Sequence, residues 1–309
     1  MLNNPLEMVR VTESAAIAAS QWIGTGDKLG ADKAATEAMR SRLNLIEFAG
    51  RIQIGEGKKD KSAGLFAGEL VGLFRGRPGI PHEELAVDPI DGTRPTVSSG
   101  PEALSVMAVA QENALFTTEE VYMNKIAYGP KTASRVKLHI GDPIDKTIGA
   151  LSRATGKVIS NIVVCILDRP RHEKVIAQLR RTGVRIKLIQ DCDISGAIAT
   201  CLPDSGIDLL LGVGGAPEGV ITACAMKCLQ GGFEGQLIKQ DGLTPADDRI
   251  LSIDDLVRGV CAFAATGITD GSLLKGVRFT SRGAVTHSIA MHSTSGTVRW
   301  ITTHHGPPK

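Results

Sequence analysis

The chain has 309 residues, of which 42% are hydrophobic, 4% aromatic and 22% charged, and its formal net charge is +2. This length is enough for a substantial buried core in one or two domains. The near-neutral charge and the lack of a basic tract argue against nucleic-acid binding. The longest apolar runs, such as 162–167, are too short to span a membrane, and Glu7 and Glu13 interrupt any signal-like N-terminal segment.

Six cysteines are scattered through predicted strands and helices, and none forms a Cys-x-x-Cys pair. Their pattern favours buried small apolar side chains in a reducing compartment over metal ligands or disulfides. We therefore expect a cytoplasmic protein.

The first half of the chain begins with two predicted helices, at 7–22 and 31–46, joined by a glycine-rich loop that would place Asp32 in a first helical turn. Short strands are predicted at 51–54, 71–74, 85–87, 104–110 and 125–127, and a helix is predicted within 141–157. Strands in quick succession after helices favour a mixed sheet. We place the join between two domains here, at 1–150 and 151–309.

The second half reads as three consecutive β-α units. The predicted strands are 162–167, 185–189 and 207–211, and the helices that follow them are 172–182, 194–201 and 217–230. Such sheets bind ligands beyond the carboxyl ends of their strands. The three strand ends carry the unusual sequences DRPRH (168–172), DCD (191–193) and GVGGAPEG (212–219).

Asp88-Pro-Ile-Asp91, closed by Gly92 and Thr93, follows an apolar run. It has the composition of a turn, and a turn of this kind can aim two carboxylates and several backbone N–H groups into one space, which suits divalent cations and a phosphate. The same tetrapeptide recurs at 142–145 after a predicted half-exposed strand at 136–140, and there Asp145 is predicted to cap a helix. The tetrapeptide alone is therefore weak evidence for a site.

Acidic residues stand at the ends of predicted elements at Asp32, Glu56, Asp88, Asp91 and Glu218. Each alone is more typical of a turn or a helix cap. Together they form the all-oxygen donor set that Mg²⁺ or Mn²⁺ prefers.

Arg169 and Arg171 flank Pro170 in the first of the three strand-end loops, and guanidinium groups match phosphate oxygens in pairs. A surface salt-bridge loop is an equally good interpretation of these residues alone. Tyr122 and Lys125 are further candidates for binding a distal anion. The 212–219 loop lacks the full G-x-G-x-x-G spacing, which disfavours a nucleotide-binding oxidoreductase.

These motifs resemble a known family. Asp88 to Thr93, with Gly55-Glu56-Gly57 upstream, is similar to the signature of the lithium-sensitive, magnesium-dependent phosphatases. Within that superfamily the whole chain resembles the bacterial class II fructose-1,6-bisphosphatases, in their actinobacterial-like form. The matching segments are 10–19, 122–130, 165–172, 214–228 and 265–277. The resemblance implies an α/β fold, a layered α-β-α-β-α sandwich with mixed sheets, in which residues 1–150 bind metal and phosphate and 151–309 bind the sugar.

The resemblance also implies roles for individual residues. The metal ligands would be Asp32, Glu56, Asp88, Asp91 and Glu218, helped by the Ile90 carbonyl. The catalytic residues would be Thr93, Asp91 and Asp60, with Thr93 directing the attacking water. The substrate would contact Asp91, Gly92, Thr93, Tyr122, Arg169, Pro170, Arg171, Asp191, Cys192, Asp193 and Gly215. The family also implies a homodimer or homotetramer, and Mg²⁺ or Mn²⁺ as cofactor.

The chain departs from the family pattern at several positions. Lys58 to Lys61 replace an acidic stretch, and Cys192 stands where the family usually has glycine. The implied activity is hydrolysis of the 1-phosphate of fructose 1,6-bisphosphate in gluconeogenesis. Two alternatives share these residues: a dual enzyme that also hydrolyses sedoheptulose 1,7-bisphosphate, and a weakly active or non-catalytic sugar-phosphate-binding paralogue.

Overall fold

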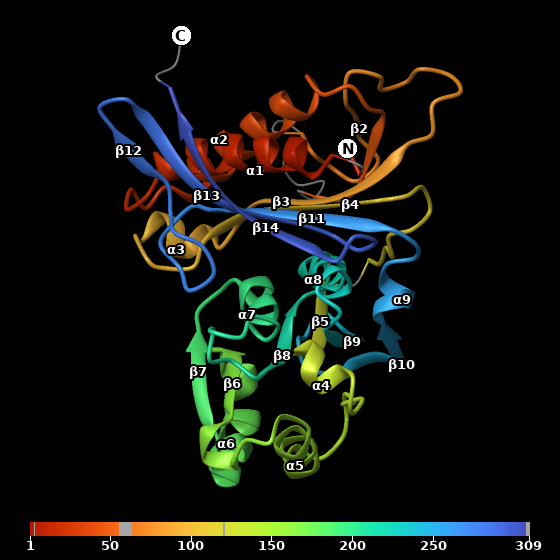
Figure 1. The fold of residues 1–309 in the computed structure, drawn as a ribbon, viewed down its shortest axis with the longest axis vertical. Coiled ribbons are helices and arrows are strands. Elements are labelled where there is room, and N and C mark those ends of the chain that lie inside the picture. The colour runs from red at the N-terminus through yellow and green to blue at the C-terminus, as the bar shows by residue number, and fades with distance from the viewer. Residues whose placement is uncertain (3, 56–63, 120, 307–309) are drawn as a thin grey trace. The chain divides into compact units, whose positions relative to one another are not determined.

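The computed structural model describes residues 1–2, 4–55, 64–119 and 121–306, and its chain divides into two compact units (Figure 1). Unit 1 comprises Met1–Thr117 and Val257–Lys309, and unit 2 comprises Thr118–Leu256. Unit 1 is therefore discontinuous in sequence. The boundary expected near residue 150 falls within unit 2, inside the helix α5 (Ile144–Thr155).

Unit 1 is built on an eight-stranded mixed sheet with the order β12-β13-β11-β4-β3-β1-β2, in which β14 pairs with β13. In the described part of this sheet β1 and β3 are parallel, and the other neighbouring strands pair antiparallel. The strands are β1 (Gly50–Ile54), β2 (Leu70–Val71), β3 (Glu83–Asp91), β4 (Leu104–Ala110), β11 (Cys261–Gly267), β12 (Arg278–Thr280), β13 (Gly283–His292) and β14 (Thr297–His305).

Helices α1 (Pro5–Ser20) and α2 (Lys28–Leu43) lie on one face of this sheet (Figure 1). Pro5 suits the first turn of α1 because that turn needs no backbone N–H donor there. Ala15, Ala16 and Ala19 are fully buried in the same hydrophobic cluster as residues of β3, β4 and β11. Small side chains on this face let the helix approach the strands closely. The sheet and α1 thus form the core on which the end of β3 is held.

Unit 2 contains a six-stranded mixed sheet with the order β10-β9-β5-β8-β6-β7. Its strands are β5 (Tyr122–Tyr128), β6 (Val163–Leu167), β7 (Arg185–Ile189), β8 (Leu209–Gly215), β9 (Gly232–Ile238) and β10 (Pro245–Ser252). Its helices are α4 (Pro130–Ala133), α5, α6 (Glu173–Thr182), α7 (Asp193–Ala199), α8 (Ala216–Cys228) and α9 (Ile253–Leu256), with short 3₁₀ turns η2 (Ile159–Asn161) and η3 (Pro170–His172). The three predicted β-α units are confirmed, because β6 pairs in parallel with both β7 and β8.

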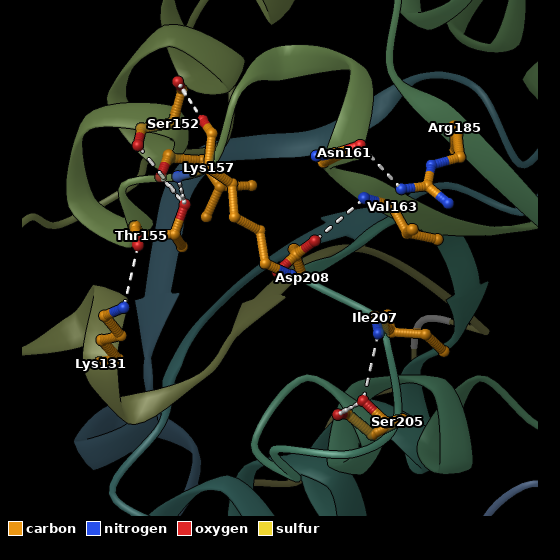
Figure 2. A network of polar contacts seen from close by, with 12 residues as sticks. Lys131, Ser152, Thr155, Lys157, Asn161, Val163, Arg185, Ser205, Ile207 and Asp208 are labelled. Carbon is orange, nitrogen blue, oxygen red and sulfur yellow. Dashed lines mark hydrogen bonds and ion pairs between the residues drawn. The ribbon is translucent and has the colours of Figure 1, made fainter.

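A polar network ties together the amino ends of β6 and β8 (Figure 2). The Asp208 carboxylate accepts hydrogen bonds from the Val163 N–H at 3.0 Å and from Lys157 Nζ at 2.6 Å. Lys131 Nζ donates to the Thr155 carbonyl at 2.9 Å. These groups are at the opposite strand ends from the DRPRH, DCD and GVGGAPEG sequences, so the carboxyl ends remain available to build a site.

Several local predictions are corrected by the structure. Residues 136–140 form no strand, and α5 begins at Ile144 with Pro143 as its N-cap, so Asp145 lies within the first turn rather than capping it. The helix expected at 31–46 begins earlier, because the Asp27 carboxylate accepts the Gly30 N–H at 3.0 Å and so caps α2. Asp32 is consequently the fifth residue of α2 and lies beyond its first turn.

The cysteines agree with the expected burial. Five are buried and Cys201 is half-buried, where burial raises the pKa of its thiol to about 12. Among the described residues, no helix is both long enough and apolar enough to cross a membrane.

Candidate active site

In unit 1, Asp88 and Asp91 lie at the irregular end of β3. The segment predicted as a turn is a continuation of the strand: Asp88 pairs with Val106 and Asp91 with Leu104, so three steps along β3 match two along β4. Residues three apart in a regular strand point to opposite faces of a sheet. The one-residue bulge cancels this offset and brings both carboxylates to the same face, which is the local reason for Pro-Ile between them.

Gly92 then turns the chain from strand to helix. Its φ of 102° and ψ of 50° are left-handed, and it is the N-cap of the short helix α3 (Thr93–Val97). A side chain at this φ would be strained, so glycine is the residue that fits here. The turn brings the Thr93 side chain next to Asp32 of α2: the Thr93 hydroxyl donates to Asp32 Oδ1 at 2.8 Å. Two residues predicted separately for the site are thus in direct contact.

The Asp91 carboxylate is buried, and Asp88 Oδ1 accepts the N–H of Ile90 at 3.0 Å. This hydrogen bond holds the Asp88 side chain over the bulge. Glu56 and Asp60, the other acidic residues predicted for this part of the site, lie outside the described residues.

In unit 2, the two strand-end arginines have different partners. Arg169 forms an ion pair with Asp191, which joins the DRPRH loop to the DCD loop. Arg171 donates from Nε and Nη2 to the Val213 carbonyl at 3.0 and 2.7 Å, and its guanidinium lies over the Tyr122 ring at 5.2 Å from the ring centre. Burial lowers the pKa of the Arg171 guanidinium. Tyr122 and Arg171, both predicted to frame a distal phosphate, are therefore neighbours.

His172 was not predicted as a site residue, but it positions the same strand end. Its Nδ1 lies 2.7 Å from the Leu167 carbonyl, and its Nε2 accepts the Val213 N–H at 2.8 Å. The ring is therefore in the neutral tautomer with the proton on Nδ1, in agreement with burial lowering its pKa. Val213 is fixed by His172 on its N–H and by Arg171 on its carbonyl. The only sequence signal was a histidine that follows Arg-Pro-Arg at a strand end.

Lys125 has a different role from the one predicted. Its side chain is fully buried, and Nζ makes an ion pair with Asp193 Oδ2 at 2.7 Å. Since Asp193 is the last residue of the DCD sequence and the first of α7, this ion pair orients a carboxylate of the predicted sugar site. Lys125 is thus placed to hold Asp193, whereas Tyr122 and Arg171 remain the candidates for direct anion contact.

In the GVGGAPEG segment, Gly212 to Gly215 continue β8 and Ala216 begins α8, so the predicted loop is a direct strand-to-helix junction. Two of its glycines leave room for carboxylates. A Cβ at Gly214 would lie 2.0 Å from Asp193 Oδ2, and one at Gly215 would lie 1.7 Å from Glu218 Oε2. Cys192, in contrast, has a side chain although its φ is 66° and it is the N-cap of α7. Glycine, which the family resemblance implies at this position, would match that left-handed geometry.

Glu218 shows the clearest mark of a cation site. Its Oε2 atom is buried and has no hydrogen-bond partner among the described residues. Burial raises its pKa, and the nearby Lys125 charge opposes that shift. An unsatisfied buried carboxylate oxygen is costly, and a divalent cation would compensate it.

Within the described residues, no three His, Cys, Asp or Glu side chains are grouped so that they could hold a metal ion. The predicted ligands belong to both units, with Asp32, Asp88 and Asp91 in unit 1 and Glu218 in unit 2. The donor chemistry fits Mg²⁺ or Mn²⁺, because every predicted side-chain donor is a carboxylate.

Comparison with known proteins supports the resemblance. Residues 3–305 match the model of the family described as bacterial fructose-1,6-bisphosphatase, glpX-encoded. A protein of Synechococcus elongatus named D-fructose 1,6-bisphosphatase class 2/sedoheptulose 1,7-bisphosphatase is 38% identical over 331 aligned positions, which cover 97% of this chain and 95% of that protein. A protein of the same name from Synechococcus sp. strain JA-2-3B'a(2-13) is 39% identical, with 97% and 94% covered. The chain therefore belongs to the glpX-type family of bacterial fructose-1,6-bisphosphatases.

Proposed function

We propose that the protein hydrolyses the 1-phosphate of fructose 1,6-bisphosphate, giving fructose 6-phosphate and inorganic phosphate. The observation that carries this proposal is the bulged end of β3, where Asp88 and Asp91 share a face and Thr93 donates to Asp32. The full-length family match supports the substrate class. The dual alternative, with sedoheptulose 1,7-bisphosphate as a second substrate, is favoured by the names of the cyanobacterial relatives.

The predicted metal ligands, most of them in unit 1, and Thr93 would act on the reacting phosphate. A bound Mg²⁺ or Mn²⁺ would neutralise the phosphoryl oxygens, acidify the attacking water and stabilise the leaving alkoxide. Asp32, Glu56, Asp88, Asp91 and Glu218 would hold the metal, with the Ile90 carbonyl. Because the Thr93 hydroxyl donates to Asp32, its oxygen can accept a hydrogen bond from the water, and the proton can pass through Thr93 toward Asp32. Asp60 is proposed as a further catalytic group.

Around the phosphate, the Gly92 and Thr93 backbone would bind the group that is released. Water oxygen bonds to phosphorus as the bond from phosphorus to the sugar O1 breaks, and O1 then takes up a proton. No phosphorylated residue of the protein is required.

The unit 2 residues would bind the part of the substrate that does not react. Arg171 uses two donors on Val213, so its remaining N–H groups, together with Tyr122, would contact the distal phosphate. Arg169 and Pro170 would complete the contacts to that phosphate. The sugar would lie against Asp191, Cys192, Asp193 and Gly215, with Lys125 fixing one oxygen of Asp193 and leaving the other for a hydroxyl group.

We further propose membership in the lithium-sensitive phosphatase superfamily, in its actinobacterial-like branch, a cytoplasmic location and a homodimeric or homotetrameric assembly. In this proposal residues 1–150 contribute most of the metal and phosphate contacts, and residues 151–309 contribute most of the sugar contacts.

The first experiment is a phosphate-release assay on fructose 1,6-bisphosphate with Mn²⁺, with Mg²⁺ and with EDTA. We expect release that requires a metal, and a parallel assay with sedoheptulose 1,7-bisphosphate separates the single from the dual enzyme. Folded protein that binds the sugar phosphate without releasing phosphate in either metal would contradict the proposal and favour the non-catalytic paralogue.

A further inference from the structure

Strand β14 forms a long outer edge of the unit 1 sheet. All nine of its residues pair with β13, from Ala284 opposite His305 to His292 opposite Thr297. On its other side, no strand pairs with it within the described part of the chain. Its backbone donors and acceptors on that side form a template for one more strand.

The remaining sheet edges carry the features that usually prevent such pairing. Strands β2 and β12 have only two and three residues. Strand β7 has five residues, with Arg185 and Lys187 among them. Strand β10 begins with Pro245, carries Asp247 and Asp248, and pairs irregularly with β9. Short length, charge, proline and bulges are the known protections of a sheet edge.

Strand β14 lacks most of these protections. Its sequence TVRWITTHH is rich in β-branched residues and contains no proline and no acidic residue. Trp300 at its centre is 53% exposed, although large aromatic side chains are usually covered. On the face that lies toward α1, Ile301 packs only partly against the core cluster. The strand therefore has the composition of an interior strand that is paired on both sides, although it lies exposed at the edge of the sheet.

The sequence of β14 is complementary to itself in one antiparallel register. If a two-fold axis perpendicular to the sheet relates the two copies, one residue of β14 must lie opposite the same residue of the other copy. The reason is that residues opposite each other in neighbouring strands point to the same side of the sheet. With Ile301 facing Ile301, all nine residues pair. Arg299 then faces Thr303, Trp300 faces Thr302, and Val298 faces His304, so no cation faces another. A shift of the axis to Thr302 would place Arg299 opposite His305 and shorten the ladder.

From this edge we infer that a second copy of the chain binds at β14, strand to strand and antiparallel, with the two-fold axis at Ile301. The unit 1 sheets of two copies then form one continuous sheet. Ile301 of each copy covers the apolar edge of the other, and the indole of Trp300 packs on Thr302 across the interface. The inference concerns assembly and does not depend on the proposed reaction.

Charge substitutions test the register on the exposed face of β14. In the double variant Trp300→Glu/Thr302→Glu, two Glu–Glu pairs would face each other, and we expect the mass measured by sedimentation equilibrium to halve relative to the wild type. The matched variant Trp300→Lys/Thr302→Glu would place Lys opposite Glu twice and should keep the wild-type mass. Circular dichroism confirms that both variants fold. A wild type that sediments as a single chain, or a double-Glu variant with unchanged mass, would overturn the inference.

A cysteine cross-link tests the position of the axis. Facing residues in an antiparallel pair have Cα atoms about 4.5–5.5 Å apart, within the range of a disulfide. Ile301→Cys should therefore give a cross-linked dimer on a non-reducing gel after mild oxidation. Val298→Cys would place its two copies about 20 Å apart, at about 3.4 Å per residue, and should not cross-link. Wild-type protein controls for the native thiols, and cross-linking of Val298→Cys in preference to Ile301→Cys would contradict this register.

Discussion

The tetrapeptide Asp-Pro-Ile-Asp occurs twice in the chain and adopts two unrelated structures. At 88–91 it forms the bulged end of a strand, followed by the left-handed Gly92 and a short helix. At 142–145 it leads into α5, whose N-cap is Pro143, and Asp142 forms an ion pair with Lys146 one turn later. The difference begins with the residue that follows, glycine in one copy and lysine in the other.

The two copies also differ in the range of their contacts. Around the first copy, Thr93 contacts Asp32, 61 positions earlier in the chain. Long-range contacts also fix the unit 2 strand ends, where Arg171 and His172 bind the backbone of Val213, 42 and 41 positions later in the chain. Asp142 is paired with a residue only four positions away. Side chains held by distant parts of the chain keep a defined geometry, which phosphate chemistry requires, whereas a local ion pair on a helix surface is worth little.

The largest expected effect on activity distinguishes the two copies of the tetrapeptide directly. We expect Asp88→Asn to lower metal-dependent phosphate release by at least about a hundredfold, because the carboxylate would hold the group that stabilises charge in the transition state. The protein should stay folded by circular dichroism. Asp142→Asn is the matched control and should leave turnover unchanged. Equal activities of the two variants would remove Asp88 from the site.

The second prediction concerns the left-handed residue after the first copy. Gly92→Ala should lower the free energy of unfolding by about 1–2 kcal/mol, because an L-residue is strained at this φ, and it should also lower turnover as Asp91 and Thr93 shift. Gly156→Ala at the end of α5 is the control, since its φ is 76° and a Cβ would meet nothing within 4 Å. It should cost similar stability in a urea titration but leave turnover intact. Full activity in the Gly92 variant would show that this turn does not position the site.

The third prediction concerns His172, which holds Val213 in its neutral form. His172→Gln should lower the free energy of unfolding at pH 8 by about 1–3 kcal/mol, because a buried hydrogen bond is lost. The lowered pKa of His172 means that the unfolded chain binds its proton first as the pH falls, so wild-type stability decreases below about pH 6.5. The gap between variant and wild type should therefore narrow from pH 8 to pH 5.

Urea titrations of wild type and variant across this pH range measure the effect. A gap that is constant with pH would mean that His172 is not held neutral by the fold.

The smallest expected effect is at Cys192, the left-handed N-cap of α7. Cys192→Gly should relieve strain of about 1–2 kcal/mol, partly offset by the greater backbone entropy of glycine in the unfolded chain. The net change in the free energy of unfolding, measured by thermal unfolding, should be within about 1 kcal/mol. A larger loss would show that the buried thiol contributes packing that outweighs the strain.

Much of the fold could be predicted from local patterns in the sequence. Apolar patterns located the first two helices, the strand at 104–110 and the three β-α units, because most of these elements bury their apolar residues. Strand β7 is the exception, since only its last residue, Ile189, is buried. The alternation at 136–140 was misleading: Leu138 is buried through the packing of a loop and not through a strand. At the site, the residue types indicated carboxylate and arginine chemistry, and this remains a prediction.

Other features could not be predicted because they depend on contacts between distant segments. The bulge at Asp88–Asp91 is defined by its register against β4, which no local pattern specifies. The roles of Lys125 and His172 follow from partners 68 and 41 positions away. The discontinuity of unit 1 arises because Cys261–Gly267 pairs with Leu104–Ala110 across the whole of unit 2.

That discontinuity has a consequence for synthesis on the ribosome. Unit 2 is one uninterrupted segment, so all of its strands have emerged before the last part of unit 1 is made. In unit 1, β4 gains its neighbour β11, and α1 gains part of its packing surface, only after residues 261–292 are translated. Domains generally fold as units during translation. Unit 2 can thus fold first. The amino-terminal helices of unit 1 remain partly exposed until the last strands of unit 1 have been translated.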